Sequence, residues 1–346
     1  SFMKKLLILG FILQGVLMAA FVKEIEIKER KVPVVFEEEK YLPIVSMQLV
    51  FKNAGHLSNT IDGLADMAAR IMNEGTSKEG SVGFATKLDA HAVDIGAHVG
   101  RESFVIEVSS LKSEFPYALE RLEELLKDPN YTQEALDHIK HQKIAWLTRK
   151  KSDFDYIAGK TLRATLFKGS VLARPYDGTV ESIKKISLED IQTFISTNLG
   201  YNNAIGVVGG DITFDEAEGY LKRVLALFPK VEEKEEKSIQ ASNKKEVVFK
   251  HEDTQQAYIY FGAPFNYSYK EKDQYLAKIA EYLLGGAGFG SRLMEEIRVK
   301  RGLTYGVYSS LRRTKPVSYL SGYMQTKLST QDEAIALIQE VVDTFL

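Results

Sequence analysis

The order in which strand and helix patterns follow one another constrains the fold of this chain most strongly. Over residues 22–53 apolar residues alternate with polar ones, which is the period of a strand with one buried face. From Ile61 to Met72 apolar residues recur at every third or fourth position, which indicates one face of a helix that stops at Gly75. Further strands are indicated at residues 92–97, 104–108 and 204–208. Further helices are indicated at residues 117–126, 135–148, 188–197 and 214–228. The first half is therefore predicted to be a sheet covered by helices.

The same order returns in the second half of the chain. Two strands are indicated at residues 247–249 and 257–261, and a helix follows at 273–284. Two more strands are indicated at 304–309 and 319–325, and a last helix begins at Gln331. The two series are offset by roughly 210 to 217 residues, which indicates an internal duplication. The predicted fold class is therefore α+β, with two homologous α/β-sandwich units, each a mostly antiparallel sheet covered by helices.

The charged stretch 231–246 is the best candidate for a domain boundary. The 346 residues exceed the roughly 250–300 that a single hydrophobic core normally serves. Residues 231–246 are polar and lack apolar periodicity, as a linker does, although one face of a solvated helix has a similar composition. We predict a first domain over residues 21–230 and a second over 247–346. The second is expected to be incomplete, because it has no counterpart of residues 131–228.

The N-terminal residues have the features of an exported protein. Residues 1 and 2 precede Met-Lys-Lys and are interpreted as an expression remnant. Two lysines, an apolar stretch over residues 6–17 and small residues before Phe21 then match a signal peptide. We predict a periplasmic protein whose mature chain begins near Phe21. The alternative is an uncleaved membrane anchor.

Charge and cysteine content exclude several classes of function. Lys and Arg number 45 against 47 Asp and Glu, so no basic field exists to attract nucleic acid or an anionic membrane. No cysteine occurs, which excludes disulfides, thiolate metal ligands and cysteine nucleophiles. Histidine, aspartate and glutamate are the remaining conventional metal ligands.

The segment from Gly63 to Thr76 resembles the pitrilysin/insulinase family of zinc metallopeptidases, in particular its processing-peptidase branch. Active members of that family have the inverted motif His-x-x-Glu-His on this helix, followed by Gly-Thr. The motif positions here are Asp66, Ala69 and Arg70. Arginine stays charged in proteins and would repel zinc, and alanine offers no general base. The segment is thus a degenerate motif, and Asp66 and Arg70, four residues apart, are expected to form a helical ion pair instead.

The resemblance also implies a third zinc ligand, a glutamate, in the helix over 135–148. No acidic residue occurs between His138 and Ser152, and Trp146 and Leu147 are near the expected position. One alternative remains, because His138 and His141 are three residues apart and Asp137 is adjacent, so they could face one ion. Our prediction is that this chain binds no metal.

The segment from Gly285 to Ser309 resembles the same family more closely. In relatives an Arg and a Tyr reach from the second domain, or from a second subunit, into the zinc site, and they correspond to Arg298 and Tyr305. A guanidinium and a phenol suit the negative charge that develops on a peptide carbonyl. The alternative makes Arg298 an ion-pair partner of Glu295 or Glu296, and Tyr305 an ordinary strand residue.

The glycine-rich run in this segment is a candidate substrate loop. It lacks the Gly-Lys-Ser/Thr ending of a phosphate loop, so nucleotide binding is not expected. The non-catalytic subunit of processing peptidases has a glycine-rich loop near this place, which helps to handle substrate, and the run resembles it. Its glycines are Gly285, Gly286, Gly288 and Gly290.

The leading hypothesis is a non-catalytic subunit of a heterodimeric zinc-dependent peptidase. The homologous partner would hold the zinc, its ligands and the general base, and would cleave peptides, while this chain supplies Arg298 and Tyr305. One alternative is a catalytically inactive scaffold or binding protein of the same fold. Another is a stand-alone peptidase that uses unusual metal ligands.

Overall fold

The computed structural model describes residues 20–345, except 236–237, 267–271 and 273. The chain forms two compact units. Unit 1 consists of the described residues up to Gln142 together with Glu181–Lys234, and unit 2 consists of Lys143–Val180 together with the described residues from Glu235 onward. The predicted signal peptide lies, apart from Ala20, outside the described residues. Within the described ranges, no helix is both long and apolar enough to cross a membrane.

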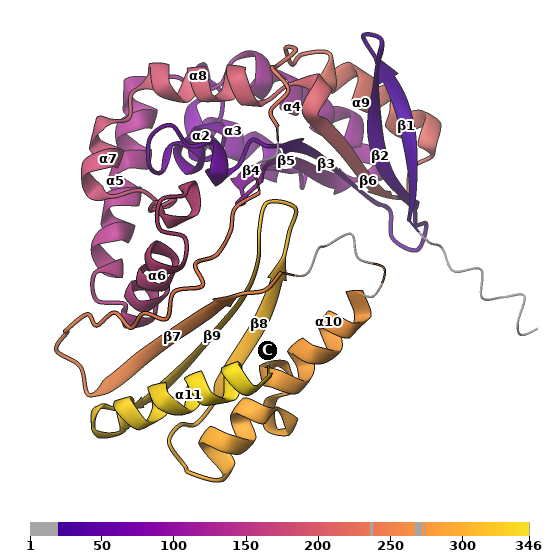
Figure 1. The fold of residues 1–346 in the computed structure, drawn as a ribbon. Helices are drawn as coiled ribbons and strands as arrows, with labels where there is room; N and C mark the ends of the chain where they lie inside the picture. The colour runs from indigo at the N-terminus through magenta and orange to yellow at the C-terminus, as the bar shows by residue number, and fades with distance from the viewer. Residues whose placement is uncertain (1–19, 236–237, 267–271, 273, 346) are drawn as a thin grey trace, which may run out of the picture. The chain divides into compact units, whose positions relative to one another are not determined.

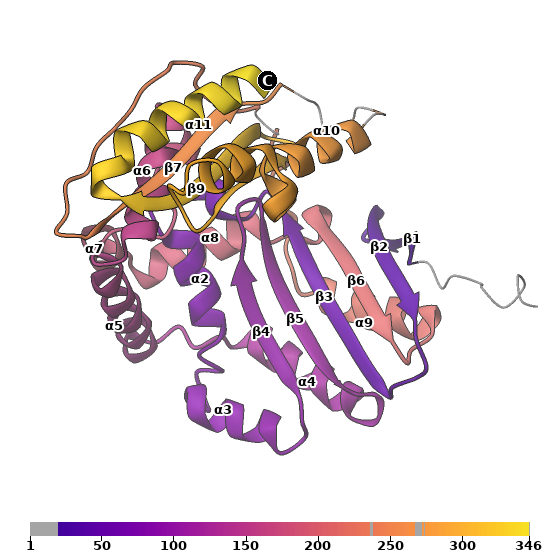
Figure 2. The same ribbon diagram turned by 90° about the horizontal axis from the view of Figure 1, so that it is seen from below.

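Unit 1 is built on a six-stranded sheet (Figures 1 and 2). The strand order is β1-β2-β6-β3-β5-β4, so β1 and β4 are the edges. All neighbouring pairs are antiparallel except β2 and β6, which are parallel. The strands are β1 (Phe21–Ile27), β2 (Arg30–Glu38), β3 (Ile44–Lys52), β4 (Asp94–Val99), β5 (Ser103–Leu111) and β6 (Ala204–Gly210).

One face of this sheet carries the core of unit 1. Along β3 every second side chain, from Val45 to Phe51, is buried, whereas the side chains between them are more exposed. Helices cover the buried face: the ring of Phe214 packs edge-on against Phe36 of β2 at 5.4 Å, and between two of these helices the ring of Tyr220 packs edge-on against Phe115 at 5.4 Å. Each large apolar side chain buried in this way contributes about 1.5–3 kcal/mol.

The helices of unit 1 begin and end where the sequence supplies caps. Thr213 and Glu216 form a capping box at the start of the last helix, and Ser187 and Asp190 form another. The helices are α2 (Leu64–Met72), α3 (Gly80–Asp89), α4 (Phe115–Lys127), α5 (Gln133–Lys150), α7 (Val180–Lys185), α8 (Leu188–Asn198) and α9 (Phe214–Leu225). Short 3-10 turns are η1 (His56–Ser58), η2 (Lys112–Glu114) and η4 (Tyr201–Asn203). Helix α5 continues across the boundary into unit 2.

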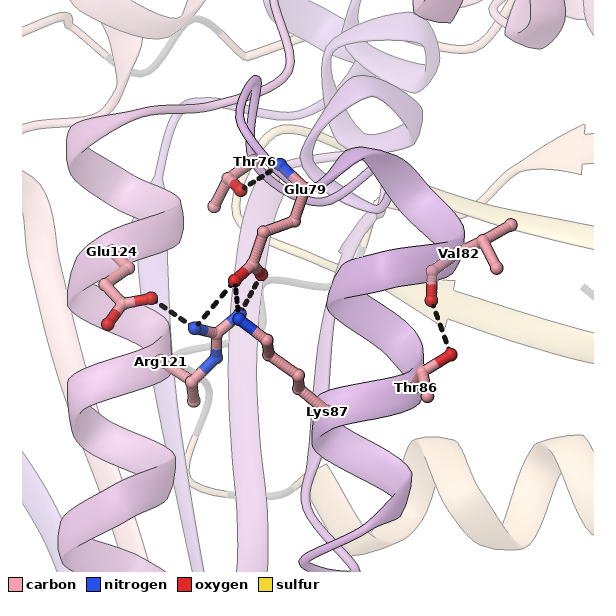
Figure 3. Close-up of polar contacts among 7 residues, drawn as sticks. All are labelled: Thr76, Glu79, Val82, Thr86, Lys87, Arg121 and Glu124. Carbon is pink, nitrogen blue, oxygen red and sulfur yellow. Dashed lines mark hydrogen bonds and ion pairs between the residues drawn. The ribbon is translucent and has the colours of Figure 1, made fainter.

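A buried arginine joins α3 to α4 (Figure 3). The side chain of Arg121 is 5% exposed, and its guanidinium is paired with the carboxylates of Glu79 and Glu124. Lys87 is also paired with Glu79, and the Arg121 guanidinium carbon lies 4.6 Å from the centre of the Phe84 ring. The hydrogen bonds that Glu79 accepts from Arg121, and then from Lys87, lower the pKa of its carboxyl.

Unit 2 has a three-stranded antiparallel sheet in the order β7-β9-β8 (Figure 1). Its elements are α6 (Phe154–Leu166), η3 (Val171–Ala173), β7 (Gln256–Pro264), α10 (Gln274–Glu281), the π-helical η5 (Tyr282–Gly286), η6 (Gly288–Gly290), the π-helical η7 (Met294–Val299), β8 (Val307–Arg313), β9 (Ser318–Lys327), η8 (Leu328–Thr330) and α11 (Gln331–Phe345). Helix α11 and the helical segment 284–297 pack against one face of the sheet, where Leu320 and Met324 are buried. Helix α6 packs against the other face: the ring of Phe167, just after α6, meets Tyr319 edge-on at 4.9 Å.

The predicted fold class is confirmed, since both units combine a mostly antiparallel sheet with helices. The predicted strand at 247–249 is wrong: the described residues from 231 to 255 form neither helix nor strand, and Val247, Val248 and Phe249 are exposed. Helices α3 and α6 were not predicted. The compact units also differ from the predicted domains, because α6 packs on β7 and so groups residues 143–180 with the second half.

Candidate functional site

The degenerate motif lies on α2 as an ion pair. Helix α2 begins after Gly63, whose φ of 89° is left-handed, and ends at Asn73. The Nε atom of Arg70 donates to Oδ2 of Asp66 at 2.8 Å, so the predicted i, i+4 pair is present. The two side chains are 33% and 21% exposed. The methyl group of Ala69 is buried in the core of unit 1.

These residues do not fit a zinc ion. The Asp66 carboxylate is already paired with a cation, the Arg70 guanidinium has no lone pair to donate to a metal, and Ala69 offers no base. Among the residues that the structure describes, no group of three or more His, Cys, Asp or Glu side chains is placed to hold a metal.

Helix α5 is equally unsuited at the position where relatives have their third ligand. Leu147 is buried, and the Trp146 ring packs edge-on against Tyr156 at 5.6 Å. The ammonium of Lys143, a buried side chain, lies 4.4 Å from the centre of the Trp146 ring. Apolar and cationic groups therefore occupy this part of the helix.

The alternative metal site around His138 is not supported by the geometry. Its Nδ1 atom lies 3.0 Å from Oε2 of Glu74, and its Nε2 atom lies 3.0 Å from the Gln142 side chain, so both ring nitrogens have protein partners. The Asp137 carboxylate accepts a hydrogen bond from Gln133 at 2.7 Å. Of the three candidate ligands, two are therefore engaged elsewhere.

Arg298 lies on the π-helical turn η7 and rests on an aromatic ring. Its guanidinium carbon is 4.3 Å from the centre of the Phe289 ring, which is the geometry of a cation–π contact. The alternative ion pair of Arg298 with Glu295 or Glu296 is not present among the described residues, and Glu296 is bonded instead to Lys300 at 2.7 Å and to Arg301 at 3.0 Å. These two hydrogen bonds lower the pKa of the Glu296 carboxyl.

Tyr305 is presented to solvent by a loop that is itself well anchored. Its side chain is 90% exposed, and it precedes β8 rather than lying in it, because that strand begins at Val307. The adjacent Thr304 hydroxyl donates to the main-chain oxygen of Gln325 at 2.6 Å. The main-chain N–H of Leu303 donates to the oxygen of Ile297 at 3.0 Å, which ties the loop to η7. Backbone anchoring thus fixes the start of the Tyr305 side chain and leaves its phenol free to reach outward.

The glycine-rich run is partly explained by packing. A Cβ atom on Gly285 would lie 2.2 Å from the Ser309 hydroxyl, which β8 places against it. Gly288 has a φ of +58°, which favours glycine, and Gly286 leaves little room, with a Cβ position 3.2 Å from a main-chain oxygen. Gly290 has no such constraint.

Phe289, the one aromatic residue within the glycine run, was not predicted as a functional residue. It lies 67% exposed in η6 and forms the surface on which the Arg298 guanidinium rests. The available signal was an isolated aromatic residue between two glycines, at a place where no core is expected.

Comparisons with known proteins agree with the motif analysis. The family model described as insulinase (peptidase family M16) matches residues 33–180, and the model described as peptidase M16 inactive domain matches residues 185–346. The "non-peptidase homolog YmxG" of Helicobacter pylori is 41% identical over 348 residues, which cover 99% of this chain and 80% of that protein.

Two further relatives are similar to this chain, one in its fold and one in the sequence of the processing-peptidase branch. A crystal structure of a peptidase M16 inactive domain from Pseudomonas fluorescens matches with a TM-score of 0.84 and 25% identity, covering 94% of this chain and 79% of that one. The mitochondrial-processing peptidase subunit beta of Dictyostelium discoideum is 24% identical over 166 residues, which cover 48% of this chain and 35% of that protein. The resemblance inferred from the motifs is confirmed.

Proposed function

The chain belongs to the insulinase family, peptidase family M16, and we propose that within this family it is the non-catalytic subunit of a heterodimeric zinc-dependent peptidase. In this proposal the homologous partner holds zinc and the general base, and it cleaves peptides. This chain supplies Arg298 and Tyr305 to the partner's active site.

The observation that carries the proposal is the contrast between the two motifs. In unit 1 an Asp66–Arg70 ion pair stands where relatives hold zinc. In unit 2 the guanidinium of the half-buried Arg298 rests on the Phe289 ring, and Tyr305 projects from an anchored loop. Both η5 and η7 are π-helical, and such turns occur frequently at functional sites. The similarity to a relative named as a non-peptidase supports the lack of catalysis, and the similarity to another named as a subunit supports assembly with a second chain.

The chemistry assigned to the pair is stabilisation of negative charge. When a peptide carbonyl becomes tetrahedral its oxygen becomes an oxyanion, which hydrogen-bond donors stabilise in the transition state. A guanidinium donates from a fixed planar fork, and a phenol donates a single O–H. Neither group needs a metal on its own chain for this role.

The proposal is tested by mixing the full chain with a homologous chain that has His-x-x-Glu-His intact, and measuring cleavage of a fluorogenic peptide. Loss of one oxyanion donor lowers kcat by roughly 10²–10³-fold, so Arg298→Ala and Tyr305→Phe are each expected to have an effect of this order. Assembly of the pair, followed by analytical ultracentrifugation, is expected to be unchanged.

Matched controls come from the same unit. Arg312 and Tyr275 are exposed, so Arg312→Ala and Tyr275→Phe are expected to leave cleavage unaltered. If the pair assembles but Arg298→Ala and Tyr305→Phe behave like these controls, the proposed role fails. A scaffold function would then be the better account.

Three further predictions complete the proposal. We propose that the glycine-rich run with Gly285, Gly286, Gly288 and Gly290 contacts substrate, that residues 231–246 form the boundary between two domains, and that the chain is exported to the periplasm. N-terminal sequencing of the protein recovered from the periplasm is expected to start near Phe21. An intact N-terminus on a protein retained inside the cell would contradict export.

A further inference from the structure

The outer edge of the sheet in unit 1 is formed by β4. The hairpin between β4 and β5 closes with a hydrogen bond from the N–H of Gly100 to the oxygen of Ser103, at 2.8 Å. Because bonded and non-bonded pairs alternate in an antiparallel ladder, the main-chain groups of Ile95, Ala97 and Val99 point away from β5. Such a row of outward N–H and C=O groups is a template for an added strand.

A single side chain occupies the middle of this row. The Asn73 side-chain oxygen accepts a hydrogen bond from the N–H of Ala97 at 2.8 Å, and its side-chain nitrogen donates to the oxygen of Ala97 at 2.9 Å. A carboxamide with both bonds reproduces what one peptide unit of a neighbouring strand would offer. Asn73 ends α2, three residues beyond Arg70, so the helix with the degenerate motif also supplies this contact.

Unit 2 has the same arrangement with different residues. Its edge strand β8 is the first strand of a hairpin that closes with a hydrogen bond from the N–H of Thr314 to the oxygen of Val317, at 3.0 Å. Because bonded and non-bonded pairs alternate from there, the main-chain groups of Val307 and Leu311 point away from β9. The N–H of Leu311 donates to Oε1 of Glu281 at 2.9 Å, and the N–H of Val307 to the Met294 sulfur at 3.3 Å. In each unit a helical segment on the N-terminal side of the hairpin thus supplies side chains that bond to outward groups of the edge strand.

We propose that these side chains close the β4 and β8 edges, so that neither of these two strands accepts an extended peptide, and that Asn73 is the residue that closes β4. An added strand must bond to outward residues two apart in sequence, and Asn73 blocks the central one. Ile95 and Val99 then remain as isolated positions that cannot support a continuous ladder. Closure of these two edges depends on this chain's own residues and not on a zinc-bearing partner.

The first test measures amide exchange of Ala97 in the full chain, by NMR with alanine labelled with nitrogen-15. Losing a hydrogen bond of ordinary strength is expected to speed exchange of this amide about tenfold in Asn73→Ala. Asn73→Asp is the matched control, because a carboxylate still accepts the Ala97 N–H, so slow exchange is expected to persist. Equal exchange in the wild type and Asn73→Ala would overturn the proposal.

The second test measures binding of a fluorescent peptide, Lys-Thr-Val-Thr-Val-Thr-Lys, by anisotropy. The wild type is expected not to bind, whereas Asn73→Ala binds, and N-methylation of alternate peptide residues abolishes that binding. Asn73→Ser, whose side chain is too short to reach both Ala97 groups, is a second variant with the same expectation, and circular dichroism verifies folding. Binding to the wild type as tight as to the variants, or binding to none, would overturn the proposal.

Discussion

Replacing Arg121 by alanine is predicted to destabilise unit 1 through the network between α3 and α4. The change removes both ion pairs of a guanidinium that is 5% exposed, and it removes the contact with the Phe84 ring. Breaking a fully buried pair costs about 3–5 kcal/mol. The Glu79 side chain, however, is 19% exposed and keeps its ion pair with Lys87. We therefore expect Arg121→Ala to lower the free energy of unfolding by about 2–3 kcal/mol.

The prediction includes a pH dependence whose sign follows from Glu79. Its pKa is lowered in the folded chain, mainly by the hydrogen bond from Arg121 and then by that from Lys87. As pH falls, the Glu79 carboxyl takes up a proton in the unfolded chain before it does so in the folded chain, near the usual glutamate pKa of about 4.3. The stability that the network supplies is therefore present above that pH and is lost below it. Arg121→Ala is expected to weaken this loss.

The assay is urea unfolding followed by circular dichroism, with hydrogen exchange of α3 and α4 as a local readout. Glu124→Gln is the internal control: it removes the partner of Arg121 that is 54% exposed, and a change under about 1 kcal/mol is expected. A cost for Glu124→Gln equal to that of Arg121→Ala, or an unaltered midpoint in Arg121→Ala, would refute the reasoning.

Two further predictions concern unit 2. Gly285→Ala places a methyl group against Ser309 and is expected to lower stability by about 1–3 kcal/mol in thermal unfolding, whereas Gly290→Ala stays within about 0.5 kcal/mol; equal effects would contradict the packing explanation. Burial first, and then Asp155, raise the pKa of Tyr260 to about 12. Between pH values of about 10 and about 12 the Tyr260 phenol therefore keeps its proton in the folded chain but loses it in the unfolded chain. The free energy of unfolding is expected to fall as pH rises through that range. Phenolate absorbance should show that Asp155→Asn lowers the Tyr260 pKa, and an unchanged titration would contradict this.

The parts of the fold that follow from local geometry could be predicted from the sequence. Helix α2 follows from apolar residues at helical spacing, and the Asp66–Arg70 pair follows because residues four apart share one helix face. The strand predicted at 247–249 failed because a short apolar run forms a strand only when a neighbour pairs with it. Helix α3 was missed because its ten residues contain two glycines and bury only Phe84 and Leu88.

The candidate site was less predictable, because its details depend on contacts distant in sequence. Spacing along a helix suggested Glu295 or Glu296 as partners of Arg298, but η7 is a π-helical turn, and the guanidinium rests on Phe289 instead. Likewise, nothing in the pattern showed that Asn73 would bond to β4, because that contact needs the helix and the hairpin to be folded together.

From the Asp66–Arg70 ion pair on α2 we infer that this chain holds no zinc there and cleaves no peptide by itself. The most direct measurement is a titration of zinc into the purified full chain, with metal analysis after gel filtration and a peptide-cleavage assay on the same sample. The expected result is zinc well below the stoichiometric amount and no cleavage. Stoichiometric zinc together with peptide cleavage by the isolated chain would contradict the account.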